Sequence, residues 1–257
     1  MGASSRQVVS LVCNTPPIDS ETPTPFVVAI IGGSWNIGAA TAKAFAQAGA
    51  TGIIITGSTK SLHLLETKIQ VEAAASSPDL KVTALAADLG DPSSAKLVAD
   101  TITSIYGCLD LLINNSAIVS THESAFNKLI GIDIDQIQKT MEVNYIGKFA
   151  LIKALLPLIL ISESGKKTII NITSGMAHFA SMGSIGYNIS ELALNRLTEA
   201  VTESYGGEGM LAYAVHPGIV ATMPPIGMAP DGRPWPSMTL DFVVRFCFGW
   251  SRSDGSG

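Results

Sequence analysis

The chain has 257 residues, of which 47% are hydrophobic and 14% are charged, and this length and composition suit one large buried core in a single domain. The formal net charge is −5 and lysine and arginine form no cluster, so nucleic acid and anionic membrane surfaces are excluded as expected partners. The three cysteines have neither paired nor metal-ligand spacing, which favours a reducing, cytoplasmic setting and predicts no metal site.

The N-terminal residues 1–25 are expected to form a flexible arm, followed by one domain over residues 26–257. The arm contains the stretches Asn-Thr-Pro-Pro at 14–17 and Thr-Pro-Thr-Pro at 22–25. Proline fixes φ and lacks a backbone donor, so these stretches oppose both helix and sheet. No uninterrupted apolar run in the chain approaches the ~20 residues that a membrane-spanning helix needs, and we expect no membrane contact.

Short apolar runs alternate with longer segments of helical period from residue 26 to residue 215. The runs have the length and composition of buried parallel strands that are apolar on both faces, and they cover 26–31, 52–56, 81–86, 110–113, 167–172 and 211–215. The segments with apolar residues three and four apart cover 37–48, 61–75, 93–105, 136–160 and 186–205. This alternation predicts an α/β fold of the Rossmann type, a doubly wound parallel sheet with helices on both faces and ligands at the carboxyl ends of the strands.

The first predicted strand runs into a glycine-rich turn, in which residues 31–38 read Ile-Gly-Gly-Ser-Trp-Asn-Ile-Gly. A turn of this kind before a helix presents backbone N–H groups and the helix dipole to a pyrophosphate. Asn36 stands where a glycine would be expected, and asparagine enters the left-handed region more readily than other non-glycine residues. Taken alone, the turn is also compatible with tight packing and no ligand.

Further motifs follow the later strands in order. They are Asp88-Leu89, Asn-Asn-Ser-Ala at 114–117, Asn-Ile-Thr-Ser at 171–174 with Tyr187 thirteen residues after Ser174, and His-Pro-Gly-Ile-Val-Ala-Thr at 216–222. With the glycine-rich turn, these motifs resemble the classical short-chain dehydrogenase/reductase family over about residues 26–224, and the general character of the sequence resembles fungal members.

The resemblance implies a role for each motif residue. Ser174 would bind the substrate oxygen, Tyr187 would pass a proton to or from it, and Asn144 would organise a water chain. The cofactor-binding residues implied by the resemblance are Gly32, Ser34, Asn36, Ile37, Gly38, Ser58, Asp88, Leu89, Asn115, Tyr187, Pro217, Gly218, Val220 and Thr222. His216 lies beside this last motif and is a candidate for substrate contact.

The choice between NAD and NADP usually depends on the end of the second strand, where a carboxylate binds the ribose 2′-hydroxyl or a basic group binds the 2′-phosphate. Residues 56–60 contain no carboxylate. The positions that are often basic in NADP-using members hold Trp35 and Ser58, and Lys60 is the nearby cation, unless it is simply a solvated lysine. We therefore expect NADP(H) to be favoured over NAD(H).

The family pattern Tyr-x-x-x-Lys ends here in Glu191, which inverts a charge near the catalytic tyrosine. Residues four apart share a helix face, so Glu191 is expected to raise the pKa of Tyr187 and to oppose its ionisation. Reduction can still use a neutral Tyr187 as the acid, whereas alcohol oxidation suffers more. Lys148, one turn beyond Asn144, is a candidate replacement for the missing cation, although a surface position is the favoured interpretation.

The function expected is an NAD(P)(H)-dependent oxidoreductase that reduces a carbonyl, or oxidises the alcohol, of a moderately apolar small molecule, with a place in fungal secondary metabolism. The alternatives are a non-redox catalyst, such as an isomerase, dehydratase or cyclase with Tyr187 and Glu191 as an acid/base pair, and a non-catalytic paralogue. Residues 223–257 are expected to form an irregular lid. The closing strand of the family is expected to be lacking, either because the chain is truncated or because another chain completes the edge of the sheet. A dimer or tetramer through the two long helices is implied by the resemblance.

Overall fold

The structure is a computed structural model that describes residues 25–61, 63–120, 125, 127–162, 167–179, 184–218 and 220. The expected N-terminal arm up to residue 24, Thr222 and the expected lid at 223–257 lie outside the described residues.

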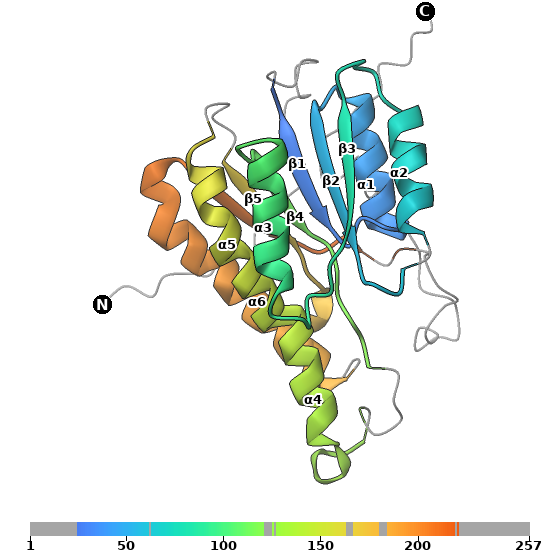
Figure 1. The fold of residues 1–257 in the computed structure, drawn as a ribbon. Helices are drawn as coiled ribbons and strands as arrows, with labels where there is room; N and C mark the ends of the chain where they lie inside the picture. Colours follow the sequence, from blue (N-terminus) through green and yellow to red (C-terminus); the bar gives the residue numbers. More distant parts are fainter. Residues whose placement is uncertain are drawn as a thin grey trace, which may run out of the picture.

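A single parallel sheet organises the described part of the chain (Figure 1). Its strands are β1 (Val27–Ile31), β2 (Gly52–Gly57), β3 (Lys81–Ala86), β4 (Leu111–Asn114), β5 (Thr168–Ile172) and β6 (Leu211–Val215). Their order is β3-β2-β1-β4-β5-β6, so the chain winds outward from β1 in one direction and then from β4 in the other. This order confirms the predicted doubly wound sheet, and it places a switch point between β1 and β4, where ligands bind in such folds.

The strands differ in burial according to their place in the sheet. Every residue of β1, β2 and β4 is buried, and β5 is nearly so, as expected for strands covered on both faces. The edge strands β3 and β6 are partly exposed, and Leu211 and Tyr213 of β6 are 50% and 43% exposed. The prediction of burial on both faces was therefore wrong for β3 and β6, which are the outermost strands of the sheet formed by the described residues.

Helices cover both faces of the sheet (Figure 1). They are α1 (Asn36–Gln47), α2 (Leu64–Ala73), α3 (Ser94–Ile105), α4 (Ile134–Met141), α5 (Lys148–Leu160) and α6 (Ile185–Tyr205). Four of the five predicted helices are confirmed with ends that differ by a few residues, and the one predicted over residues 136–160 is divided between α4 and α5. Helices α1 and α2 pack on one face through a cluster that includes Ala42, Val71, Ile30 and Ile55.

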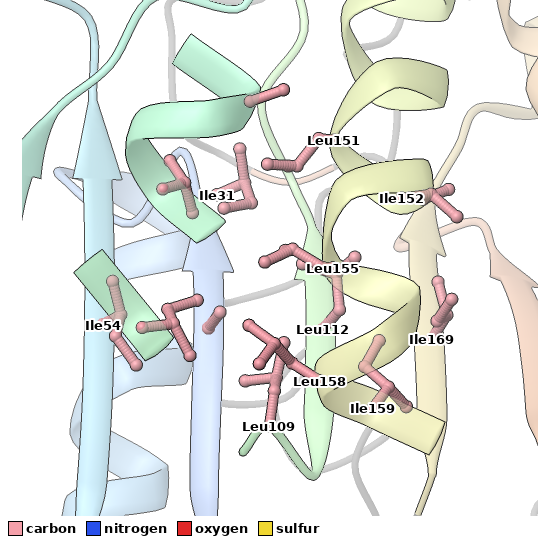
Figure 2. Close-up of a cluster of buried hydrophobic side chains, with 14 of the residues drawn as sticks. Ile31, Ile54, Leu109, Leu112, Leu151, Ile152, Leu155, Leu158, Ile159 and Ile169 are labelled. Atoms are coloured by element: carbon pink, nitrogen blue, oxygen red, sulfur yellow. The ribbon is translucent and has the colours of Figure 1, made fainter. Parts of the chain in front are cut away.

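The opposite face carries the larger hydrophobic cluster, in which α3, α5 and α6 meet the sheet. Figure 2 shows Leu151 of α5 beside Ile31, Leu155 beside Leu112, and Ile159 beside Ile169. These α5 positions are four residues apart, so one helix stripe lies over β1, β4 and β5. The helical stretch from Ile134 to Leu160 is long and apolar enough by composition to span a membrane. A core helix can have the same composition, and α5 contributes this stripe to the core.

The predicted helix over residues 136–160 is not continuous. A π-helical segment, Glu142–Gly147, separates α4 from α5. The segment packs tightly on the loop after β3, since a Cβ added at Gly147 would lie 2.2 Å from the Leu89 carbonyl oxygen. π-Helical turns are rare and occur frequently at functional sites, and this one carries Asn144.

The packing of Gly147 gives a prediction about stability. Alanine has the higher helix propensity by about 1 kcal/mol, but here its methyl group would collide with backbone. We expect Gly147→Ala to lower the free energy of unfolding by about 1–3 kcal/mol, as overpacking does. Gly207→Ala is the matched control, because an added Cβ there meets nothing within 4 Å, and it should change stability by less than about 0.5 kcal/mol. Urea denaturation measures both, and equal stability of the two variants would contradict the packing argument.

Candidate active site

The glycine-rich turn between β1 and α1 is anchored to β2. The N–H of Gly32 donates to Thr56 Oγ1 at 3.2 Å, and the N–H of Gly33 donates to the Thr56 carbonyl at 2.8 Å. Gly32 has φ +78°, and Asn36 is left-handed with φ +51°. The expectation that asparagine takes over a glycine-like conformation is therefore confirmed.

The turn also packs on the loop after β4. Asn115 Nδ2 donates to the Gly32 carbonyl at 2.9 Å, and a Cβ at Gly32 would lie 2.7 Å from Ser116. Gly38 in the first turn of α1 is equally restricted, because a Cβ there would lie 2.1 Å from the Gly32 oxygen. The predicted residues Gly32, Gly38 and Asn115 thus form one closely packed unit at the switch point of the sheet.

A cavity of about 790 Å³ lies at this edge of the sheet. Predicted cofactor residues that line it are Gly32, Ser34, Asn36, Ile37, Ser58, Asp88, Leu89 and Asn115. The N-terminus of α1 at this cavity has no side-chain cap and no acidic residue in its first turn, and the buried Ser116 hydroxyl has no hydrogen-bond partner within the described ranges. Unpaired donors and a positive dipole end fit the pyrophosphate of a dinucleotide.

One end of the cavity is bounded by two parallel rings. Trp35 and His63 stack with centroids 5.9 Å apart and planes 5° from parallel. Ser58 and Lys60 are exposed beside them and also line the cavity. The contact of His63 with Trp35 was not predicted, because nothing in the sequence pattern links the two residues. Lys139 of α4 is a second lining residue that was not predicted.

Asp88 follows β3 and stabilises its own loop, since its Oδ1 accepts from the N–H of Gly90 at 3.0 Å. Its side chain is half-buried at the cavity, and Leu89 beside it is buried. The arrangement is compatible with the predicted contact between Asp88 and an adenine amino group.

Asn144 is fully buried and joins three elements. Its Oδ1 accepts from the N–H of Ile118 and its Nδ2 donates to the Ile118 carbonyl, both at 2.8 Å. Nδ2 also lies 3.2 Å from Ser190 Oγ, which donates to the Tyr187 carbonyl at 2.8 Å. The residue therefore links the loop after β4 to the first turns of α6, where Tyr187 lies.

Ser174 and Tyr187 come together at the carboxyl end of β5. Ser174 begins a 3₁₀ turn, Gly175–His178, and its hydroxyl accepts from the N–H of Met176 at 3.2 Å. The pKa of Tyr187 is raised to about 12, chiefly by burial and also by the charge of Glu191, while hydrogen bonding with Ser174 acts to lower it. Tyr187 is therefore a protonated phenol at neutral pH and faces the serine hydroxyl.

The motif after β6 lies beside this pair. The His216 ring packs on Gly175, where an added Cβ would lie 3.2 Å from His216 Nε2, and burial lowers the pKa of His216. Gly218 has φ +79°, which glycine adopts without strain. Pro217, Gly218 and Val220 are described but do not line the 790 Å³ cavity, and neither do Ser174, Tyr187 and Glu191.

The expectation of a surface position for Lys148 was wrong. Lys148 is fully buried, and Glu191 is only 1% exposed. The charge of Glu191 acts on Lys148 and raises its pKa, against the larger lowering by burial. Burial raises the pKa of Glu191, and Lys148, Thr173 and the Ser174 backbone lower it. The carboxyl group of Glu191 therefore lies in the protein interior, where it interacts electrostatically with the Lys148 ammonium group.

Sheet order, switch point and motif positions define a Rossmann-type α/β protein with a serine–tyrosine pair at its ligand edge. The family model for short chain dehydrogenase matches residues 26–225. The chain belongs to the short-chain dehydrogenase family, and it is a classical member that resembles fungal ones.

Among similar proteins, the short chain dehydrogenase mpl6 of Monascus purpureus is 37% identical over 197 residues, which are 76% of this chain and 65% of that relative. The chain thus matches less than two thirds of the length of that curated relative. The short chain dehydrogenase pgmD of Aspergillus terreus is 33% identical over 83% of this chain and 70% of its own. A short chain dehydrogenase of Burkholderia cenocepacia, solved in complex with NADP, has a TM-score of 0.72 at 25% identity, covering 86% of this chain and 87% of that one.

The left-handed conformation of Asn36 gives a prediction about the turn. Asn36→Val should lower the free energy of unfolding by about 1–2 kcal/mol, because a branched side chain is strained at φ +51°. Asn36→Gly should change it by less than about 0.5 kcal/mol, since glycine adopts this conformation freely. Denaturation without added nucleotide measures both variants, and a glycine variant as unstable as the valine variant would show that the asparagine side chain, not its φ, matters.

Proposed function

We propose that the protein is an NADP(H)-dependent oxidoreductase that reduces a carbonyl, or oxidises the corresponding alcohol, of a moderately apolar small molecule in fungal secondary metabolism. The observation that carries the proposal is the pairing of Ser174 with a protonated Tyr187 at the sheet edge that also carries the uncapped turn and cavity. The fungal relatives support the setting.

The roles of the residues follow from their protonation. The bound nicotinamide would supply or accept hydride. Ser174 donates a hydrogen bond to the substrate oxygen, and neutral Tyr187 donates its phenolic proton as negative charge develops there. Because a pKa of about 12 keeps the phenol protonated, these residues are set for reduction. Oxidation needs the phenolate, which is scarce at neutral pH.

The non-redox alternative needs Glu191 to act on the substrate as half of an acid/base pair. Its side chain is 1% exposed, and its charge interacts with Lys148 and with the end of β5. A buried carboxyl group in this position acts through its neighbours, so we favour redox chemistry.

The residues that line the cavity support a preference for NADP(H) over NAD(H) and the proposed cofactor-binding residues. Lys60 and Ser58 lie at the end of β2 with the Trp35–His63 stack. Neither β2 nor residues 58–61 contain a carboxylate that would repel a 2′-phosphate. We assign the pyrophosphate to the turn at Gly32, Ser34, Asn36 and Ile37, and the nicotinamide side to the motif at 217–222.

Exposed apolar side chains support two further parts of the proposal. Phe179, just after the turn that begins at Ser174, and Val119, just after Ile118, are 58% and 47% exposed, and they suit an apolar substrate.

Ile146, Phe149, Ile189 and Leu192 are exposed on the π-helical segment, α5 and α6. An apolar surface on these long helices fits the proposed dimer or tetramer.

Nucleotide binding tests the cofactor proposal directly. A fluorescence titration with NADPH and separately with NADH, through energy transfer from tryptophan, should show tighter binding of NADPH. Lys60→Ala should weaken NADPH binding about 5- to 10-fold, which is about 1–1.4 kcal/mol, and leave NADH binding unchanged. Lys153→Ala, which alters an exposed lysine of α5 outside the cavity, is the control. If the protein bound neither NADPH nor NADH, the proposal would be refuted.

The pH dependence tests the role of Tyr187. With NADP⁺ and an alcohol, the rate should rise about tenfold per pH unit from pH 7 to 10, because the phenolate fraction rises so far below a pKa of about 12. With NADPH and a panel of ketones, ionisation of Tyr187 should not lower the reduction rate over this pH range, because the phenol stays protonated. Tyr187→Phe should lower both activities by about 10²- to 10⁴-fold, followed by absorbance at 340 nm. An oxidation rate that levels off near pH 8 would contradict the assignment.

A further inference from the structure

Lys148 is the largest fully buried side chain of the described residues, and its position is unusual for a lysine. Its Nζ has no hydrogen-bond partner in the part of the chain that the structure describes. Lysine is almost never fully buried unless it is paired, because removing an ammonium group from water costs several kcal/mol.

Glu191 is in the same situation on the neighbouring helix. It is 1% exposed, and its Oε1 likewise lacks a hydrogen-bond partner among the described residues. The two elements meet at this level, since Asn144 Nδ2 lies 3.2 Å from Ser190 Oγ. Lys148 is one turn after Asn144, and Glu191 directly follows Ser190. Two opposite buried charges therefore lie on adjoining turns, and each acts electrostatically on the other.

We propose that Lys148 is a positioning residue whose ammonium group balances the carboxylate of Glu191 and thereby sets the proton affinity of Tyr187. This role rests on the proposed redox function of Tyr187. The charged state of the two groups and the neutral state, in which the proton has moved from lysine to glutamate, have the same total charge of zero. Tyr187 is then influenced by the Lys148–Glu191 dipole and not by the net negative charge of Glu191 alone. The charge that is inverted at the last position of Tyr-x-x-x-Lys is thereby offset by Lys148 on α5.

Other groups also act on the two charges. Glu191 is the charge that acts on Tyr187, and the Thr173 hydroxyl and the Ser174 backbone act on the Glu191 carboxyl group from the end of β5 and lower its pKa. Charged side chains of α3 and α6 pair at the surface, as Lys96 with Asp100 and Arg196 with Glu199, each at 2.5 Å.

The test compares the ionisation of Tyr187 in four proteins: the unaltered chain, Lys148→Met, Glu191→Gln and the double variant. Each is titrated from pH 7 to 11 by the absorbance difference at 295 nm between it and the same protein carrying Tyr187→Phe. We expect no ionisation of Tyr187 in this range in the unaltered chain or in Lys148→Met. Glu191→Gln removes the anion that acts on Tyr187 and leaves the Lys148 cation without its counter-charge. This change should lower the pKa of Tyr187 by about 1–3 units, and the pKa in the double variant should lie higher than in Glu191→Gln.

Equal titration of Tyr187 in Glu191→Gln and in the double variant would overturn the proposal, because the lysine would then have no electrical effect on the phenol. This measurement needs neither cofactor nor substrate, so it can fail or succeed independently of the oxidoreductase proposal. Nucleotide binding and turnover test that proposal separately.

Stability gives a second readout in case Lys148→Met folds poorly. Removing one partner leaves the other buried and unpaired, whereas removing both leaves none. The double variant should therefore unfold at a higher urea concentration than either single variant. The same cycle on Lys96→Met and Asp100→Asn, an exposed pair, should show additive effects. Additive effects at Lys148 and Glu191 would also overturn the proposal.

Discussion

The two hydrogen bonds between the Asn144 carboxamide and the backbone of Ile118 hold the functional edge of this protein together. They fix the loop after β4, which forms one wall of the cavity, to the π-helical segment between α4 and α5. Through Ser190 the same carboxamide reaches the turn of α6 that carries Tyr187. Because all of these groups are buried or half-buried, loss of the amide would leave several unpaired polar atoms, which makes this connection the most constrained part of the site.

Local pattern was sufficient to predict the strands, the helices and their winding. Apolar runs of strand length separated by helical periodicity allow few arrangements, and the right-handed crossover rule reduces them further. The left-handed Asn36 was also predictable, since φ preference belongs to the residue itself. The partial exposure of β3 and β6 was not predictable, because composition does not tell which strands lie outermost in the sheet of the described residues.

The parts of the site that escaped prediction all depend on contacts between distant segments. Trp35, in the turn after β1, stacks on His63, just before α2, and no sequence pattern predicts this contact. The π-helical segment depends on how closely Gly147 can approach Leu89. Lys148 was predicted at the surface from the general rule for lysine, and that rule fails where a buried carboxyl group lies on the next helix.

The burial of Lys148 also bears on how this protein can be altered. A sequence comparison would suggest restoring lysine at position 191 as the first way to improve it. In this structure that change would place two ammonium groups in one water-poor space with no anion between them, so position 191 cannot be considered apart from position 148. A change that adds or removes one of the two charges alone leaves the other buried without its counter-charge, so substitutions at the two positions have to be designed together.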